Sequence, residues 1–154
     1  MAKAATNAND EAQIRARLNE WVRASQAKDL DAIMASYAPD VLAFDAIGKL
    51  EFRGVEAYRK HWEECLSYCE EMRFEMHDLE IAAEGGLAFC HYLARCGGTS
   101  KDGQEHYGWM RGTVCLRKTN GTWLIVHEHY SSPFDPMSGK MLNLEPEHET
   151  RAAA

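Results

Sequence analysis

Residues 118–132 read KTNGTWLIVHEHYSS and carry the clearest turn signal of the chain. An Asn-Gly pair favours a two-residue turn between antiparallel strands, because both residues tolerate the positive φ angles of that turn. The residues after the pair are mostly apolar, aromatic and β-branched, as in a buried strand. This stretch predicts the end of one strand, a tight turn, and a second strand over residues 122–132.

Polar and apolar residues keep alternating towards the N-terminus of this hairpin. Glycines within residues 85–86 and 97–103 interrupt the alternation and mark further turns. The pattern therefore predicts three more strands, over residues 72–84, 87–97 and 106–118. Consecutive strands joined by short turns pair in antiparallel fashion, so the sheet is expected to be mainly antiparallel.

The first half of the chain shows helical periodicity instead. Apolar residues recur at helical spacing within residues 11–28, and the first helix is expected to begin after Asp10. Asp29 is expected to cap a short second helix that ends at Ala38, before a proline. A third helix with one apolar stripe is expected to follow Gly54.

Helices at one end of the chain and strands at the other predict an α+β fold, with three helices packed on one face of a curved sheet. A long twisted sheet that curls around helices leaves a cone, whose open mouth is a natural ligand site. Residues 10–135 are expected to form this domain. Residues 1–9 are expected to be a disordered lead-in and residues 136–154 a C-terminal tail, frayed from Glu145 onward.

The composition is that of an ordinary globular protein, with 45% hydrophobic and 27% charged residues. The formal net charge of -7 makes nucleic acids and anionic membranes poor partners, because an acidic surface repels phosphate groups. No apolar run approaches the roughly 20 residues that cross a bilayer. The N-terminus lacks the apolar centre of a signal peptide. We therefore expect a cytoplasmic protein without a nucleic-acid or membrane partner.

The five cysteines are odd in number and show no zinc-site spacing, so reduced and mostly buried thiols are expected. Cys65 and Cys69 are four residues apart and share a face of the predicted third helix. A regulatory disulfide or a metal pair is the alternative to simple packing of these two side chains.

Asp45 is the one charged residue in the apolar run VLAFDAIG at residues 41–48. A carboxylate among apolar neighbours must find partners, lie at an edge, or have its charged form disfavoured by burial. Catalytic bases are often made in such places. Asp45 is therefore the candidate general base. The alternative is a strand-end aspartate that is hydrogen-bonded near the Gly48 turn.

Two histidines in the last strand are the next candidates. Strand alternation places His127 and His129 on the face of Trp123 and Ile125, and places Glu128 on the opposite face. Both histidines are therefore predicted to point into the cavity. A His-x-His pair can also bind metal, but no third ligand is marked by spacing, so neither a metal nor a cofactor is expected. The remaining alternative is a pair of hydrogen-bonded structural histidines.

Arg111 lies among aromatic and apolar neighbours on the preceding strand. Its guanidinium can clamp an anionic ligand, or it can pair with Glu128 or another carboxylate. Aromatic side chains elsewhere either fill the core or form the wall of a ligand pocket. The residues predicted to bind substrate are Trp21, Tyr37, Phe44, Trp62, Trp109 and His129.

Three stretches carry a resemblance to a known family. They are residues 21–48, which contain AKDLDAI and FDAIG, residues 120–127, which read NGTWLIVH, and residues 127–135, which read HEHYSSPFD. With these motifs the chain resembles the NTF2-like superfamily, in its SnoaL-like and ketosteroid-isomerase-like branch, over about residues 10–140. The resemblance implies the NTF2-like cone as the fold.

The resemblance also implies roles for single residues. Asp45 falls where steroid isomerases keep their general base. Trp21 falls where they keep a tyrosine that donates a hydrogen bond to the developing oxyanion, and Trp62 falls on a supporting tyrosine. The protonated aspartate of their oxyanion hole would fall near Val114 or Cys115, and neither replaces it. Because these donors are absent, efficient steroid isomerisation is not expected.

These features predict a cofactor-independent isomerase or lyase in which Asp45 abstracts a proton next to the carbonyl of a small, mostly apolar compound. Trp21, His127 or Arg111 would stabilise the enolate-like oxygen. The alternative is a non-catalytic binding or oligomerisation module, because the 120–127 hairpin also resembles the association domain of calmodulin-dependent kinases. The resemblance implies a homodimer as well, since these proteins commonly pair through the outer sheet face.

Overall fold

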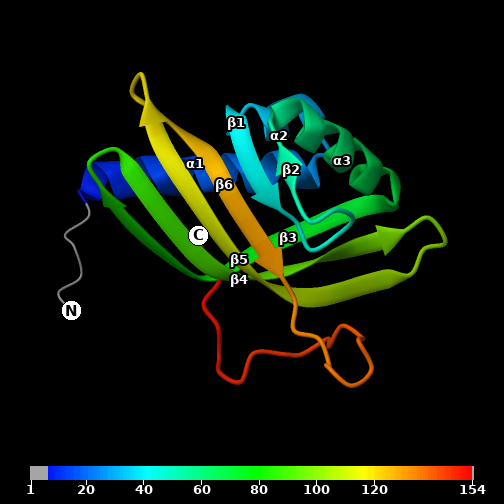
Figure 1. Ribbon diagram of the computed structural model, residues 1–154. Coiled ribbons are helices and arrows are strands. Elements are labelled where there is room, and N and C mark those ends of the chain that lie inside the picture. Colours follow the sequence, from blue (N-terminus) through cyan, green and yellow to red (C-terminus); the bar gives the residue numbers. More distant parts are fainter. Residues whose placement is uncertain (1–6, 154) are drawn as a thin grey trace.

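The computed structural model describes residues 7–153 and contains three helices and a six-stranded sheet (Figure 1). The helices pack on one face of the sheet, which curls around them. The helices are α1 (Ala8–Gln26), α2 (Leu30–Met34) and α3 (Val55–Ser67). The strands are β1 (Tyr37–Phe44), β2 (Phe52–Arg53), β3 (Cys69–Glu84), β4 (Leu87–Ser100), β5 (Glu105–Thr119) and β6 (Thr122–Ser131). The predicted α+β class is confirmed.

The strand order in the sheet is β2-β1-β6-β5-β4-β3. The four long strands β3 to β6 form consecutive antiparallel hairpins, as their turn signals predicted. β1 adds to the free edge of β6 in parallel, and β2 pairs antiparallel with β1. β2 has only two residues and was not predicted. This order brings the loop after β1 next to α3, at the open end of the cone.

The first helix begins earlier than predicted. Its N-cap is Asn7, whose side chain accepts a hydrogen bond from the backbone N–H of Asn9 at 3.0 Å. Asp10 therefore lies in the first turn, where a carboxylate is favoured by the helix dipole. The predicted lead-in is wrong for the residues from Ala8 onward, and its residues 1–6 lie outside the described part of the chain.

The second helix is shorter than predicted. Asp29 caps it as predicted, since its carboxylate accepts a hydrogen bond from the Ala32 N–H at 3.0 Å. The helix ends at Met34 because the chain then turns to pair with β6. The carbonyl of Ser36 accepts a hydrogen bond from the N–H of Ile125 at 2.8 Å, so strand pairing replaces further helical bonds.

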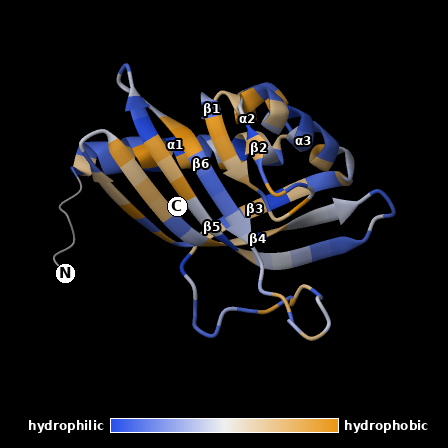
Figure 2. Cartoon of the chain, viewed as in Figure 1, coloured by the Kyte–Doolittle hydropathy of each residue, from blue (hydrophilic) through white to orange (hydrophobic). Residues whose placement is uncertain are grey.

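The core lies between α1, α3 and the inner face of the sheet. Ile14, Leu18 and Trp21 of α1 are at most 2% exposed. The ring of Trp21 meets the rings of Phe74 and Trp62 edge-on, at centroid distances of 4.9 and 5.6 Å. Figure 2 shows apolar residues concentrated in β1 and alternating with polar residues along the long strands. Edge-on aromatic contacts of this kind add to the stability that burial provides.

β6 contains a bulge at Val126. Cys115 of β5 lies opposite His127, whereas the next residue, Leu116, lies opposite Ile125. β6 therefore carries one extra residue at this point. A bulge shifts the alternation by one position, so every side chain after it changes face.

The bulge overturns the predicted orientation of the second half of β6. Trp123 and Ile125 are buried before it, and Glu128 is buried after it, with 1% of its surface exposed. His127 and His129 lie on the other face, where His129 is exposed. The prediction that both histidines point into the cavity is wrong. The acid between them points inward instead.

The C-terminal tail returns to the edge of the sheet and pairs with β3 (Figure 1). The N–H of Asp78 donates to the carbonyl of Arg151 at 2.9 Å, and the N–H of Ala153 donates to the carbonyl of Met76 at 2.8 Å. The prediction that the tail frays from Glu145 onward is therefore wrong for its last described residues. These bonds cover part of an edge strand that would otherwise offer free backbone groups.

Apolar side chains on the outer side of the sheet include Leu87 and Phe89, which are 60% and 51% exposed. Homodimer formation through this face stays a prediction. Within residues 7–153, no helix combines the length and the apolar character that a membrane span needs.

Candidate functional site

A pocket of about 480 Å³ opens between α1, α3 and the far ends of the long strands. Its wall is mainly apolar, with Trp21 and Trp62 from the helices and Phe74, Met110 and Tyr130 from the sheet. Its volume lies within the range of small-molecule sites, roughly 300–1,000 Å³. The cone is therefore not filled by its own indole rings, and it has room for a ligand.

Asp45 follows directly after β1 and lies in the wall of this pocket. Its Oδ2 atom is 3.2 Å from Nε2 of His61 and 3.2 Å from the hydroxyl oxygen of Tyr58. Its Oδ1 atom accepts a hydrogen bond from the backbone N–H of Ile47 at 3.0 Å. The side chain is 16% exposed. The carboxylate is thus held by three groups and still borders the pocket.

His61 lies on α3, and its side chain is 6% exposed. Its ring stacks on Phe52 at a centroid distance of 4.1 Å, which fixes its orientation towards Asp45. The sulfur of Cys65, one turn further along α3, is 3.6 Å from Nε2 of His61. The sequence signal for this residue is a histidine within the apolar stripe of the predicted third helix.

Glu128 lies at the centre of a hydrogen-bond network behind the pocket wall. The Tyr37 hydroxyl is 3.1 Å from both carboxyl oxygens of Glu128, and it accepts a hydrogen bond from Nε1 of Trp21 at 2.8 Å. The Tyr58 hydroxyl makes a short hydrogen bond to Oε1 of Glu128 and also faces Asp45. The network therefore links a buried carboxyl group on β6 to the carboxylate in the pocket.

Burial raises the pKa of Glu128 to about 8. The hydrogen bond from Tyr58 opposes this rise, the negative charge of Asp45 adds to it, and the hydrogen bond from Tyr37 opposes it. At neutral pH Glu128 is therefore mainly protonated. Sequence reasoning missed Glu128, although the signal was the one that identified Asp45, an acid among apolar strand residues.

Several predicted site residues lie away from the pocket. Phe44 packs its ring against the rings of His127 and His129, at centroid distances of 4.8 and 5.7 Å. Nδ1 of His127 is 2.6 Å from the carbonyl oxygen of Leu42. None of these side chains lines the pocket that contains Asp45. The bulge in β6 explains the position of the two histidines, and Phe44 follows them to the same side.

The face of β5 that carries Trp109 and Arg111 also points to the outside of the sheet. Trp109 donates its indole N–H to Glu145 at 2.8 Å, and Arg111 is exposed on the same face. Neither borders the pocket, and the predicted pairing of Arg111 with Glu128 does not occur, because Glu128 bonds to two tyrosines. Of the predicted substrate-binding side chains, the indoles of Trp21 and Trp62 line the pocket, whereas Tyr37 lies behind its wall.

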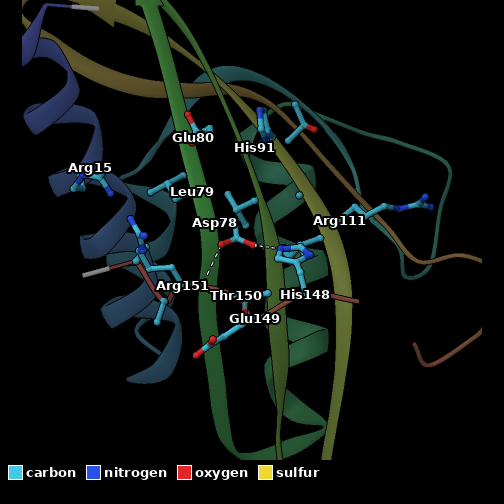
Figure 3. A pocket seen from close by; sticks show the side chains of 16 residues that line it. Arg15, Asp78, Leu79, Glu80, His91, Arg111, His148, Glu149, Thr150 and Arg151 are labelled. Atoms are coloured by element: carbon cyan, nitrogen blue, oxygen red, sulfur yellow. Dashed lines mark hydrogen bonds and ion pairs between the residues drawn. The ribbon is translucent and has the colours of Figure 1, made fainter. Parts of the chain in front are cut away.

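A second, more open groove of about 1280 Å³ lies where the C-terminal tail crosses β3 (Figure 3). Three of its charged side chains already have polar partners. Asp78 accepts hydrogen bonds from His148 at 2.7 Å and from the Arg151 N–H at 2.9 Å, and Arg15 pairs with Glu11 at 3.2 Å. Figure 3 shows the guanidinium of Arg111 pointing away from this cluster. The groove is therefore a weaker candidate than the pocket beside Asp45.

The described part of the chain contains no group of three or more His, Cys, Asp or Glu side chains suited to a metal ion. The five cysteines are free thiols, and Cys65, Cys69 and Cys96 line the pocket. Burial is the main cause that raises the pKa of Cys65 to about 11 and that of Cys90 to about 12. These thiols are therefore poor nucleophiles at neutral pH.

We expect Cys65 and Cys90 to react slowly with iodoacetamide at pH 7.5 in the folded protein. A pKa of about 11 in place of 9.0 lowers the thiolate fraction of Cys65 roughly a hundredfold. Mass spectrometry of peptides alkylated with and without urea measures this protection for each cysteine. Equal rates in the two conditions would contradict the burial of these thiols.

The comparisons with known proteins agree with this fold. The family model described as the SnoaL-like domain matches residues 14–135. A crystal structure of an NTF2-like protein of unknown function from Pseudomonas putida KT2440 is 41% identical in sequence. It superposes with a TM-score of 0.85, over 92% of this chain and 100% of that one.

More distant structures share the fold alone. A suggested dehydratase of the NTF2-like family from Streptomyces avermitilis is 15% identical, with a TM-score of 0.75 over 82% of this chain and 97% of that one. A suggested aromatic ring hydroxylase from Novosphingobium aromaticivorans is 16% identical, with a TM-score of 0.77 over 96% of each chain. The comparison with curated proteins gives no significant match. The family match over most of the chain shows that this protein is a member of the SnoaL-like domain family, with the NTF2-like fold.

Proposed function

We propose that this protein catalyses a proton transfer on a small, mostly apolar carbonyl compound, as an isomerase or a lyase that needs no cofactor. The observation that carries the proposal is the Asp45 carboxylate in the wall of an otherwise mainly apolar pocket, with Nε2 of His61 3.2 Å away. General acid–base catalysis requires such a group within hydrogen-bond reach of the substrate and of its own positioning partner.

In the proposed reaction Asp45 removes a proton from the carbon next to the carbonyl. The electron pair of the broken C–H bond moves to the carbonyl oxygen and forms an enolate. His61 orients the carboxylate through its ring nitrogen. In an isomerase Asp45 returns the same proton to another carbon. In a dehydration the proton goes to the leaving hydroxyl, which departs as water, so both reactions balance without a further reactant.

Tyr130 is the proposed hydrogen-bond donor to the enolate oxygen. Its hydroxyl lies 2.5 Å from that of Tyr92, and the single hydrogen bond between them uses only one of their two phenolic protons. Tyr130 lines the pocket, and when Tyr92 donates to it, Tyr130 keeps its own proton for a ligand. Burial raises the pKa of both phenols, which keeps them protonated. Trp21, predicted for this role, already gives its N–H to Tyr37.

We expect Asp45→Asn to slow proton exchange by about 10²- to 10⁴-fold, the usual contribution of a general base. The probe is cyclohex-3-enone in D₂O, whose deuterium uptake next to the carbonyl and conversion to the conjugated enone are followed by NMR. The amide keeps the shape of the carboxylate but cannot accept the proton.

The matched control is Asp40→Asn. Asp40 is an exposed acid on β1, paired with Arg117 at 3.1 Å, and its replacement should leave the exchange rate unchanged. Equal rates for Asp45→Asn and the unaltered protein would remove Asp45 from the mechanism. Binding of the ketone without any exchange in the unaltered protein would favour a binding module over an enzyme.

A further inference from the structure

Two carboxyl groups in this protein share one phenol. The hydroxyl oxygen of Tyr58 lies 3.2 Å from Oδ2 of Asp45 and makes a shorter hydrogen bond to Oε1 of Glu128. Asp45 borders the pocket, whereas Glu128 is 1% exposed and lies behind the wall. Glu128 therefore reaches the pocket only through the groups that it bonds, and Tyr58 is the one that also touches Asp45.

The hydrogen bond between Tyr37 and Glu128 can run in only one direction. The indole N–H of Trp21 is only a donor, so the Tyr37 hydroxyl accepts from it and gives its own proton to Glu128. The Tyr58 hydroxyl also has a single proton but faces two carboxyl groups. It can donate to one of them at a time. The protonation state of Glu128 decides which one.

When Glu128 carries a proton, it can donate to the Tyr58 oxygen, and Tyr58 then donates to Asp45. When Glu128 is ionised, the Tyr58 proton turns to it. Asp45 then keeps the hydrogen bond from the Ile47 N–H and its contact with His61, but it loses the phenol and faces a second negative charge. Loss of a donor and gain of a like charge both make a carboxylate a stronger base.

We infer that Glu128 is a positioning residue that sets the basicity of Asp45 by directing the single hydroxyl proton of Tyr58. The use of this coupling in catalysis rests on the proposed function, whereas the coupling itself exists without substrate. Glu128 does not touch the ligand. The chemical consequence is a base whose strength rises when a second, hidden acid loses its proton.

The surroundings of Glu128 leave few other groups that titrate in the same range. The groups that face it are Tyr37 on β1, Tyr58 on α3, Asp45 after β1, Tyr92 on β4 and Tyr130 on β6. Burial raises the pKa of all four tyrosines, so they stay protonated while Glu128 titrates. His61 touches Asp45 and is itself an ionisable side chain, so it needs its own control.

The test is a ¹³C NMR titration of the Asp45 side-chain carboxyl in the substrate-free protein from pH 3 to 10. We expect an upper step in its chemical shift near pH 8, which coincides with the titration of Glu128. Glu128→Gln should abolish the upper step, because a glutamine donates to Tyr58 at every pH and holds its proton on Asp45. His61→Gln should keep the upper step.

Tyr58→Phe distinguishes an effect of the shared hydroxyl from a direct effect of the Glu128 charge on Asp45. It removes the shared hydroxyl and should reduce the upper step at Asp45 while Glu128 still titrates. An upper step of unchanged size in Tyr58→Phe or Glu128→Gln would overturn the inference, and so would a Glu128 that does not titrate near pH 8. The titration needs no turnover, so the two proposals can fail separately. The coupling can be absent while Asp45→Asn still slows exchange, and the coupling can be present while Asp45→Asn leaves exchange unchanged.

Discussion

Glu128→Gln is expected to be more stable than the unaltered protein above pH 8. The unaltered protein should lose stability between pH 5 and 8, and the variant should show little of this loss. Glu128 has a pKa of about 8 in the folded protein and about 4.5 when unfolded. Between these values the folded state binds more protons than the unfolded state, so the unaltered protein loses stability as the pH rises. Below pH 4.5 both states are protonated and the effect vanishes.

The size of the effect follows from the shift. Each pKa unit corresponds to 1.36 kcal/mol, so a shift from 4.5 to about 8 gives at most about 5 kcal/mol of pH-dependent stability. Glutamine keeps the volume of the side chain and its bonds to Tyr37 and Tyr58, but it never has to be ionised. A replacement without these bonds, such as Glu128→Leu, should lower stability at every pH because it leaves buried hydroxyl groups without partners.

Urea unfolding at pH 5, 7 and 9 measures this difference. The control is Glu84→Gln, which changes an exposed glutamate at the end of β3 and should shift stability by less than about 0.5 kcal/mol at each pH. Parallel stability curves for Glu128→Gln and the unaltered protein would show that Glu128 is not buried as a protonated acid.

The same residue shows where prediction from the sequence fails. The turns and periodicities predicted the order of the helices and the four long strands, because glycines and Asn-Gly pairs act locally. The bulge at Val126 has no such local signal. It depends on how β6 pairs with β5 and β1. One extra residue in β6 is enough to place Glu128 on the inner face, where the sequence predicted His127 and His129.

The candidate site also contains residues that the local sequence indicates and residues that only long-range contacts bring together. Asp45 was found because an acid in an apolar run is visible in one segment of sequence. His61 and Tyr58 became site residues only when α3 packed against the loop after β1, a contact between distant segments. Arg111 was misplaced because its strand has an inner and an outer face, and the sequence does not show which alternate set faces the helices.

Gly97→Ala is expected to lower the stability of the protein by about 3 kcal/mol and to disturb the pocket. A Cβ atom at Gly97 would lie 1.8 Å from the carbonyl oxygen of His106 and 2.8 Å from its carbonyl carbon. Both are backbone atoms of β5, so no side-chain rotation relieves the contact. Forcing atoms into a well-packed region typically costs 1–3 kcal/mol, and backbone displacement brings the larger values. Gly97 and His106 both line the pocket, so strands that move apart here change its shape.

The control is Gly108→Ala on the adjacent strand. Its Cβ would lie 3.2 Å from the side-chain oxygen of Asn143, an exposed group that can move aside, so its effect should stay below about 1 kcal/mol. Urea unfolding gives the stability of each variant, and binding of the neutral apolar dye Nile red reports on the pocket. We expect Gly97→Ala to weaken dye binding and Gly108→Ala to leave it unchanged. Equal stability and equal dye binding in the two variants would mean that β4 and β5 do not approach as closely at the pocket as their backbones indicate.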